Sequence, residues 1–123
     1  MGLEMKIENV SDFELIYMVE VFADEFSNLF DSSDSKRYKS WLYRTLKNYE
    51  EGNLKRNVHY EPIKGYNNLY AFRYPHSKLN PRVIYAYING HNNLILLTAL
   101  LERKKSDYTI GIERAEQRKK EIF

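Results

Sequence analysis

One stretch of the sequence, residues 69–108, constrains the fold more than any other. It contains three apolar runs of strand length, Leu69–Tyr74, Val83–Ile88 and Leu94–Leu101, rich in β-branched, aromatic and leucine residues. Pro75 and Pro81 bracket the first connection, outside any central ladder. Asn89-Gly90 opens the second, because both residues tolerate the positive φ of a hairpin. This order predicts a three-stranded antiparallel meander.

Basic residues stand at the ends of the three predicted strands. Arg73 lies near the end of the first, Arg82 at the start of the second, and Arg103-Lys104-Lys105 just past the third. In an antiparallel meander these three places meet at one end of the sheet. Three cationic sites brought together in this way would suit a phosphate chain.

The chain before the meander predicts a strand and two helices. The apolar residues within 13–30 fit both the two-residue period of a strand and the 3.6-residue period of a helix. We therefore expect a strand over 13–19 and a helix over 21–31. A second helix is expected over 36–51 and ends before Gly52. Its aromatic and leucine stripe could stack on a ligand, but core packing is favoured.

The remaining segments complete the fold class. Residues 58–63 contain Pro62 and predict an edge strand. Ser106 or Asp107 can cap a C-terminal helix whose apolar face includes Tyr108. The expected fold is α+β in one domain, residues 1–123. It is a small antiparallel β-sheet flanked by two N-terminal helices and a C-terminal helix, with the helices packed on one side.

The composition of the chain limits the cellular location and the binding partners that we expect. The chain has no cysteine, its longest apolar run is too short for a bilayer, and its first ten residues have no signal-like core. We therefore expect a cytoplasmic protein without membrane contact. Residues 1–35 carry one cation and nine anions, a net charge of −8, whereas residues 36–123 carry eighteen cations and eight anions, a net charge of +10. This asymmetry indicates either a polyanion-binding face or two solvated regions that compensate each other.

The available chemistry favours a reaction without metal or cofactor. The three histidines have no ligand spacing, and glycine-rich phosphate loops and nucleophile motifs are absent. RNA can be cleaved without a metal because its own 2′-OH is the nucleophile. Such a site needs a proton acceptor, cations on the phosphate and a donor for the leaving oxygen. The strand-end cations could stabilise charge, and Tyr108, Lys64 or His76 could move protons.

Residues 58–121 resemble the RelE/ParE toxin superfamily, in particular its HigB-like, phage-derived branch. The residues that carry the resemblance are Lys64-Gly65-Tyr66, Leu69-Tyr70, Phe72-Arg73, Arg82-Val83, Tyr85, and the basic exit Glu102 to Tyr108 with the helix around Ile112-Glu113-Arg114-Ala115. The segment between Arg73 and Arg82 is longer than in compact members, and Ala71 stands where the family usually has an acid.

The resemblance implies a RelE-like fold and a metal-independent mRNA endoribonuclease, or mRNA interferase, that inhibits translation at the ribosome. It implies a catalytic set of Arg73, Arg82, Arg103, Lys104 and Tyr108, with Lys64, His76, Lys78 and Lys105 as RNA-binding residues. In this set Arg82 contacts the scissile phosphate, and Tyr108 either helps to activate the 2′-OH or packs in the core. No metal or cofactor is implied.

The resemblance also implies partners and leaves two other functions open. The chain would be the toxin of a type II toxin–antitoxin system, neutralised by a cognate helix-turn-helix antitoxin and reaching operator DNA only through it. One alternative is a ParE-like toxin that inhibits DNA gyrase without cutting nucleic acid. The other is a non-catalytic RNA-binding domain with the same fold.

Overall fold

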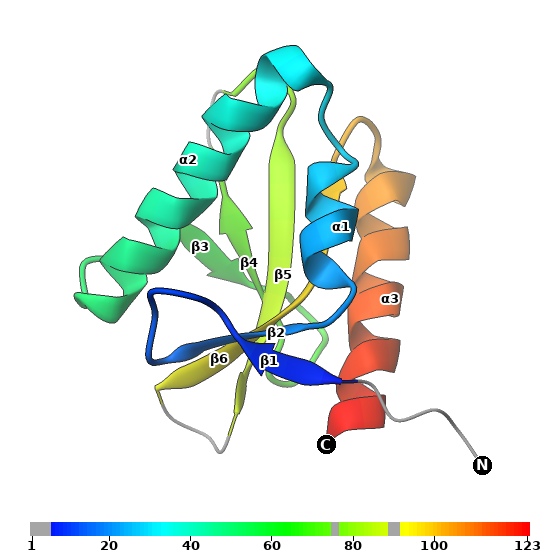
Figure 1. Cartoon of the computed structure of the whole chain (residues 1–123). Coiled ribbons are helices and arrows are strands. Elements are labelled where there is room, and N and C mark those ends of the chain that lie inside the picture. The colour runs from blue at the N-terminus through cyan, green and yellow to red at the C-terminus, as the bar shows by residue number, and fades with distance from the viewer. Residues whose placement is uncertain (1–5, 75–76, 89–91) are drawn as a thin grey trace.

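A computed structural model describes residues 6–74, 77–88 and 92–123 of the chain. The Asn89-Gly90 hairpin, Pro75 and His76 lie outside the described residues. The elements, shown in Figure 1, are β1 (Ile7–Asn9), β2 (Ile16–Val19), α1 (Phe22–Ser27), α2 (Ser32–Glu50), β3 (Tyr60–Pro62), β4 (Tyr70–Arg73), β5 (Pro81–Ile88), β6 (Asn93–Leu101) and α3 (Lys105–Ile122). The fold class is α+β, as the sequence predicts.

The sheet contains the predicted meander at its centre. Its strand order is β1-β2-β6-β5-β4-β3, and β4, β5 and β6 pair antiparallel. The proline-containing strand β3 lies at one edge, as predicted. At the other side β2 pairs with β6 in parallel, and the short strand β1 follows it. The predicted antiparallel sheet is confirmed for four of the five strand pairings in the described residues and was wrong only for β2 and β6, because the long path between these two strands allows the chain to return in the same direction.

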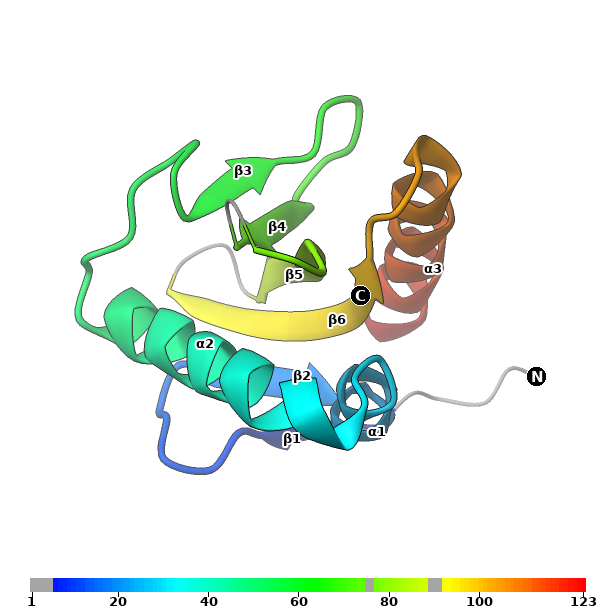
Figure 2. The same cartoon turned by 90° about the horizontal axis from the view of Figure 1, so that it is seen from above.

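The helices lie on both faces of the sheet, so the expectation of one covered side was also wrong. In Figure 1, β5 lies between α2 on the left and α3 on the right, and Figure 2 shows the same separation from above. Alternate residues of β5 point to opposite faces. Tyr87 packs near Tyr49 of α2, with ring centroids 6.4 Å apart. Ile84, of the opposite parity, faces α3 at Gly111.

A close approach of α3 to the sheet depends on Gly111. A Cβ atom added there would lie 2.1 Å from Cδ2 of Leu100, far inside van der Waals contact. A glycine inside a helix ordinarily weakens it. Gly111 instead lets the helix backbone come close to β5 and β6, and the nearby Ala115 is fully buried. This contact fixes the position of the first turns of α3.

The helix ends differ from the predicted bounds in ways that side chains explain. Helix α2 begins earlier, at Ser32, because the Asp31 carboxylate accepts hydrogen bonds from the backbone N–H of Ser33 and Asp34. It ends before Gly52, whose φ is 75°, as the sequence predicts. Helix α1 has only six residues. Helix α3 begins at Lys105 and its N-cap is Lys104, so neither Ser106 nor Asp107 holds the N-cap position. Asp107 lies in the first turn, where its carboxylate accepts hydrogen bonds from the backbone N–H groups of Arg103 and Lys104.

The apolar stripe of α2 forms part of the core. Its members Tyr38, Trp41, Leu42 and Leu46 are all buried. Tyr38 stacks on Phe30, with ring centroids 4.6 Å apart, and Trp41 stacks on Tyr74 at 5.2 Å. Core packing was thus the right reading of the stripe. Among the described residues, no helix is both long and apolar enough to span a membrane.

Candidate functional site

Arg82 is the centre of a compact polar cluster on the α3 side of the sheet. Its Nη1 atom lies 2.7 Å from Glu61 Oε1, and its Nη2 atom lies 3.1 Å from Glu102 Oε1. The Arg82 side chain is 13% exposed. Arg82 is thus mostly buried although it lies near the end of a strand. Strand β5 places Arg82 beneath the start of α3, and two carboxylates flank its guanidinium.

Strand register explains why these groups meet. Glu61 pairs with Ala71 of β4, and Ala71 pairs with Ile84 of β5, so Glu61 lies on the same face of the sheet as Arg82. Glu102 comes immediately after β6, whose last residue pairs with the first residue of β5. The Asn80 side-chain amide lies 3.3 Å from the Glu102 carbonyl oxygen and 3.4 Å from its Oε1 atom. The two carboxylates therefore approach Arg82 from different strands.

Tyr108 closes the cluster from the first turn of α3. The guanidinium carbon of Arg82 lies 5.1 Å from the centroid of the Tyr108 ring, within cation–π range. The Tyr108 hydroxyl donates to Glu61 Oε1 at 3.2 Å. Burial, and next the charge of Glu61, raise the pKa of Tyr108 well above its ordinary value. The phenol is thus a protonated hydrogen-bond donor at neutral pH. The Tyr108 ring is half-buried and packs against the core, while its hydroxyl faces the cluster. Its role in activating the 2′-OH stays a prediction.

One atom in the cluster lacks a partner. The Nε atom of Arg82 is buried and makes no hydrogen bond to any residue that the structure describes. Leaving a buried donor unpaired costs about 1–3 kcal/mol, so such an atom in a native protein calls for an explanation, for example a catalytic role or a bound ion. The cluster as a whole has two carboxylates for one guanidinium, a formal charge of −1. Both Nη atoms of Arg82 are already paired with carboxylates, so an incoming anion must displace a carboxylate before it can bind both of them.

Arg73 lies beside the cluster on the same face. Its Cα atom is the register partner of Arg82 across β4 and β5. Its guanidinium Nη1 donates to the Asn57 carbonyl oxygen at 2.9 Å, and the residue is half-buried. Of the predicted catalytic set, the structure thus brings together Arg73, Arg82 and Tyr108.

The other predicted cations lie farther out. Arg103, Lys104 and Lys105 are exposed at the start of α3, and Arg103 lines a separate hollow of about 390 Å³ together with Leu29 and Arg114. Lys64 and Lys78 are exposed in connections. His76 lies outside the described residues. These outer cations make no described contact with the Arg82 cluster.

Sequence reasoning missed Glu61 and Glu102, which hold the guanidinium. Glu61 directly precedes Pro62 in the edge strand, and Glu102 directly precedes the basic run after β6. A register prediction for β3, β4 and β5 would have placed Glu61 on the face of Arg82. Glu102 had a weaker signal, because only its position at the strand end marks it.

The cluster combines groups suited to acid–base work on a phosphodiester. Glu61 is a carboxylate that can accept a proton, Arg82 and Arg73 are cations, and Tyr108 is a donor. No group of three or more His, Cys, Asp or Glu residues that could hold a metal ion occurs in the described ranges. The position between Glu61 and Glu102, where a cation would bind, is filled by the Arg82 guanidinium.

Comparison with known proteins gives little beyond this geometry. No family model and no curated protein sequence matches the chain. Among solved structures, the chain is similar to the Escherichia coli toxin RelE, solved in the free state as a double arginine-to-alanine mutant. The TM-score is 0.49 with 14% sequence identity, and the match covers 81% of this chain and 95% of that chain.

Proposed function

We propose that the protein is a metal-independent endoribonuclease whose active site is the Glu61–Arg82–Tyr108 cluster. The observation that carries this proposal is one carboxylate oxygen, Oε1 of Glu61, which contacts both the Arg82 guanidinium and the Tyr108 hydroxyl. A proton acceptor, a cation and a donor thus lie within one hydrogen-bond network. These are the three groups that transfer of a phosphodiester to a neighbouring hydroxyl requires.

In the proposed reaction the 2′-oxygen of RNA attacks the adjacent phosphorus and the bond to the 5′-oxygen breaks. Glu61 takes the proton of the 2′-OH, and Arg82, with Arg73 beside it, stabilises the charge on the phosphorane oxygens. Tyr108, whose hydroxyl lies in the same hydrogen-bond network, supplies the proton to the leaving 5′-oxygen. The products are a 2′,3′-cyclic phosphate and a free 5′-hydroxyl. The unpaired Nε of Arg82 is one donor available to the phosphate.

The biological setting follows from the sequence resemblance rather than from the geometry. The protein acts as the toxin of a type II toxin–antitoxin pair of the HigB-like kind, cuts mRNA at the ribosome and is neutralised by a helix-turn-helix antitoxin. An antitoxin would have to cover the cluster or hold α3 in place.

The first prediction tests the cluster by substitution. Arg82→Ala and Glu61→Gln should each lower the rate of RNA cleavage by at least about 100-fold, because each removes a charge that acts in the transition state. Arg114→Ala, which removes a half-exposed arginine from α3, is the matched control and should cleave normally. Cleavage of a defined RNA is measured by gel, and a thermal melt monitors folding.

Two outcomes would overturn the assignment. One is full cleavage by both cluster variants, and the other is equal cleavage of an all-deoxy strand, which has no 2′-OH. Pulse-labelling of cells that express the protein separates the alternatives. Loss of protein synthesis fits the nuclease, whereas loss of DNA synthesis fits a gyrase inhibitor.

A further inference from the structure

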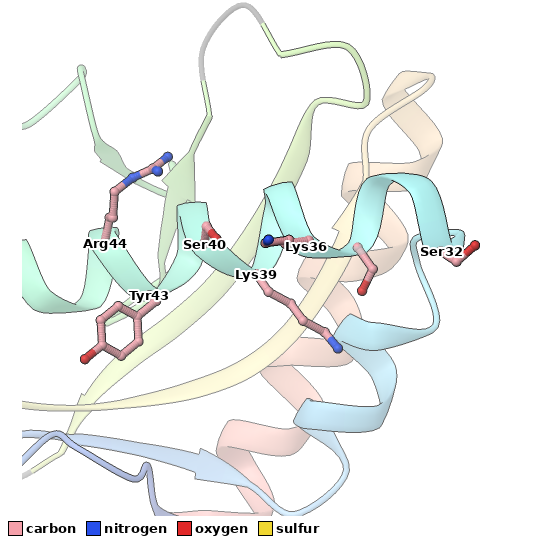
Figure 3. A pocket seen from close by; sticks show the side chains of 7 residues that line it. Ser32, Lys36, Lys39, Ser40, Tyr43 and Arg44 are labelled. Carbon is pink, nitrogen blue, oxygen red and sulfur yellow. The ribbon is translucent and has the colours of Figure 1, made fainter.

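The outer face of α2 presents a row of basic side chains around a shallow hollow. The helix carries five cations and two carboxylates between residues 32 and 50. Lys36, Lys39 and Arg44 line a hollow of about 880 Å³, together with Ser40, Tyr43 and two further serines near the start of the helix. Figure 3 shows these side chains projecting from α2 along its length. Residues four apart on a helix are neighbours about 6 Å from each other, so Lys36, Ser40 and Arg44 form one row.

These cations have no anionic partner among the described residues. The five ion pairs found there use Arg82, Arg114, Arg118 and Lys119, and none uses Lys36, Lys39 or Arg44. All three residues are exposed. Arg82, by contrast, is surrounded by two carboxylates. The α2 face is therefore one place where positive charge is not neutralised by an ion pair among the described residues, whereas the Arg82 guanidinium is neutralised.

The α2 face is separate from the Arg82 cluster. Helix α2 covers the sheet face that carries Tyr87, whereas Arg82 faces α3 on the opposite side. In Figure 1 these two helices flank β5. A single phosphate cannot contact both places, so a ligand of the α2 face is either another part of a long polymer or a different molecule.

The composition of the hollow indicates which polymer. Its lining offers hydroxyl, ammonium and guanidinium donors and one exposed phenol ring, Tyr43, but no aliphatic side chain. Protein interfaces depend on apolar or aromatic anchors that fill pockets. The hollow itself has no aliphatic lining, and the apolar pocket that adjoins it at Lys39 and Tyr43 is a separate one of about 290 Å³. Lysine, arginine and serine donors are typical partners of phosphate oxygens, and an aromatic ring can stack on a base.

We propose that the α2 face is a second RNA-binding surface, which holds the sugar–phosphate backbone of RNA away from the bond that is cut. This inference rests on the proposed ribonuclease function and extends it. The α2 face increases affinity for long RNA and takes no part in the chemistry. Its contribution is electrostatic and therefore depends on salt.

The test compares two triple variants of equal charge. Lys36→Gln/Lys39→Gln/Arg44→Gln removes the α2 cations, and Lys55→Gln/Arg56→Gln/Lys120→Gln removes three exposed cations elsewhere. The probe is a long 2′-O-methyl RNA, which binds but lacks the nucleophile. For the α2 variant, the slope of log K against log salt should become shallower by about 2, since each lost contact to single-stranded RNA contributes about 0.7. The control variant should retain the slope of the unsubstituted protein.

Cleavage of short and long RNA distinguishes the two proposals. The α2 variant should cut a trinucleotide at the normal rate and a long RNA with a raised KM. If the protein cuts no RNA at all, the proposed function fails, whereas the binding slopes still test the α2 face. Equal slopes for both triple variants would overturn the inference. So would loss of binding to polyglutamate with unchanged RNA binding, which would assign the face to an acidic protein. A thermal melt of each variant, and the double variant Lys36→Gln/Arg44→Gln, separate binding from misfolding.

Discussion

At the scale of single residues, the two carboxylates around Arg82 are not equivalent. Glu61 lies in a β-strand and accepts a second hydrogen bond from Tyr108, at 3.2 Å. Glu102 lies just past β6, and its contact with Arg82 is longer, 3.1 Å against 2.7 Å. Both compete with a phosphate for the same guanidinium. Each carboxylate accepts two side-chain hydrogen bonds, but those of Glu102, from Arg82 at 3.1 Å and from Asn80 at 3.4 Å, are the longer ones. In the proposed mechanism an incoming phosphate therefore displaces Glu102, while Glu61 stays in place as the base.

This difference predicts that two similar substitutions affect different steps, one the binding of RNA and the other its cleavage. Glu102→Gln should bind RNA several-fold more tightly than the unsubstituted protein, because it removes a competing charge beside Arg82. Glu61→Gln should bind comparably well but cleave poorly. The measurement is the Kd for 2′-O-methyl RNA at fixed salt, with the exposed Glu113→Gln as a control for net charge. Weaker binding by Glu102→Gln would show that Glu102 positions Arg82 instead of competing for it.

At the scale of elements, the sequence predicts the strongly patterned segments and misses the weakly patterned ones. The central meander, the edge strand, α2 and α3 follow from apolar period and from turn residues. Strand β1 escapes prediction because its three residues, Ile7–Asn9, are exposed and show no alternation of burial. The parallel pairing of β2 escapes because pairing depends on tertiary contacts rather than on local pattern.

The site follows the same division. Arg73, Arg82 and Tyr108 can be predicted, since each lies near the end of a strand or helix that the sequence pattern predicts. Glu61 and Glu102 cannot be found without strand register, because they meet Arg82 from strands remote in sequence. The burial of Arg82 in the cluster likewise depends on tertiary packing. A cation at a strand end is exposed by default, and only the docking of α3 buries this one.

Three elements are held together by a network around Glu25 of α1. Its two carboxylate oxygens accept hydrogen bonds from Arg118 of α3 at 2.9 and 2.8 Å, and the Thr98 hydroxyl of β6 also donates to it. Arg118 donates in addition to the Leu97 carbonyl oxygen at 2.7 Å. Burial raises the pKa of Glu25, but Arg118, Thr98 and Arg114 together lower it below its ordinary value of 4.5. The network thus ties α1 and α3 to the sheet.

The lowered pKa predicts an acid-sensitive contribution to stability. A carboxylate with a lowered pKa stabilises the folded state at pH values above its unfolded pKa and loses this effect as the pH falls through its folded pKa. Glu25→Gln should cost about 1–3 kcal/mol in the free energy of unfolding at pH 7. The difference from the unsubstituted protein should shrink as the pH falls below about 4.5. Urea melts across this range measure it, with Glu113→Gln as the control. A pH-independent difference would contradict the linkage.

At the scale of the whole molecule, charge is segregated in space as well as in sequence. Residues 36–123 carry a net charge of +10, yet the proposed active site contains two carboxylates for one guanidinium. The surplus positive charge lies on exposed positions, among them the outer face of α2 and the start of α3. Such a surface attracts a polyanion over a distance, whereas the cluster engages a phosphate only at contact. In the two proposals, RNA is thus bound by one part of the molecule and cleaved by another.

The donor set of the whole molecule leads to the last prediction, which concerns metal ions. The described residues contain no cluster of three metal-ligating side chains, and the guanidinium of Arg82 already occupies the space between Glu61 and Glu102. In the proposed mechanism Arg82 and Arg73 stabilise the charge on the phosphorane. Cleavage of a short, unstructured RNA should therefore proceed at an unchanged rate in excess EDTA. A magnesium-dependent nuclease assayed in parallel should stop. Ribosomes require magnesium themselves, so the assay must use naked RNA. Loss of cleavage on chelation, with recovery on addition of Mg²⁺, would show that a metal and not the arginine pair supplies the positive charge.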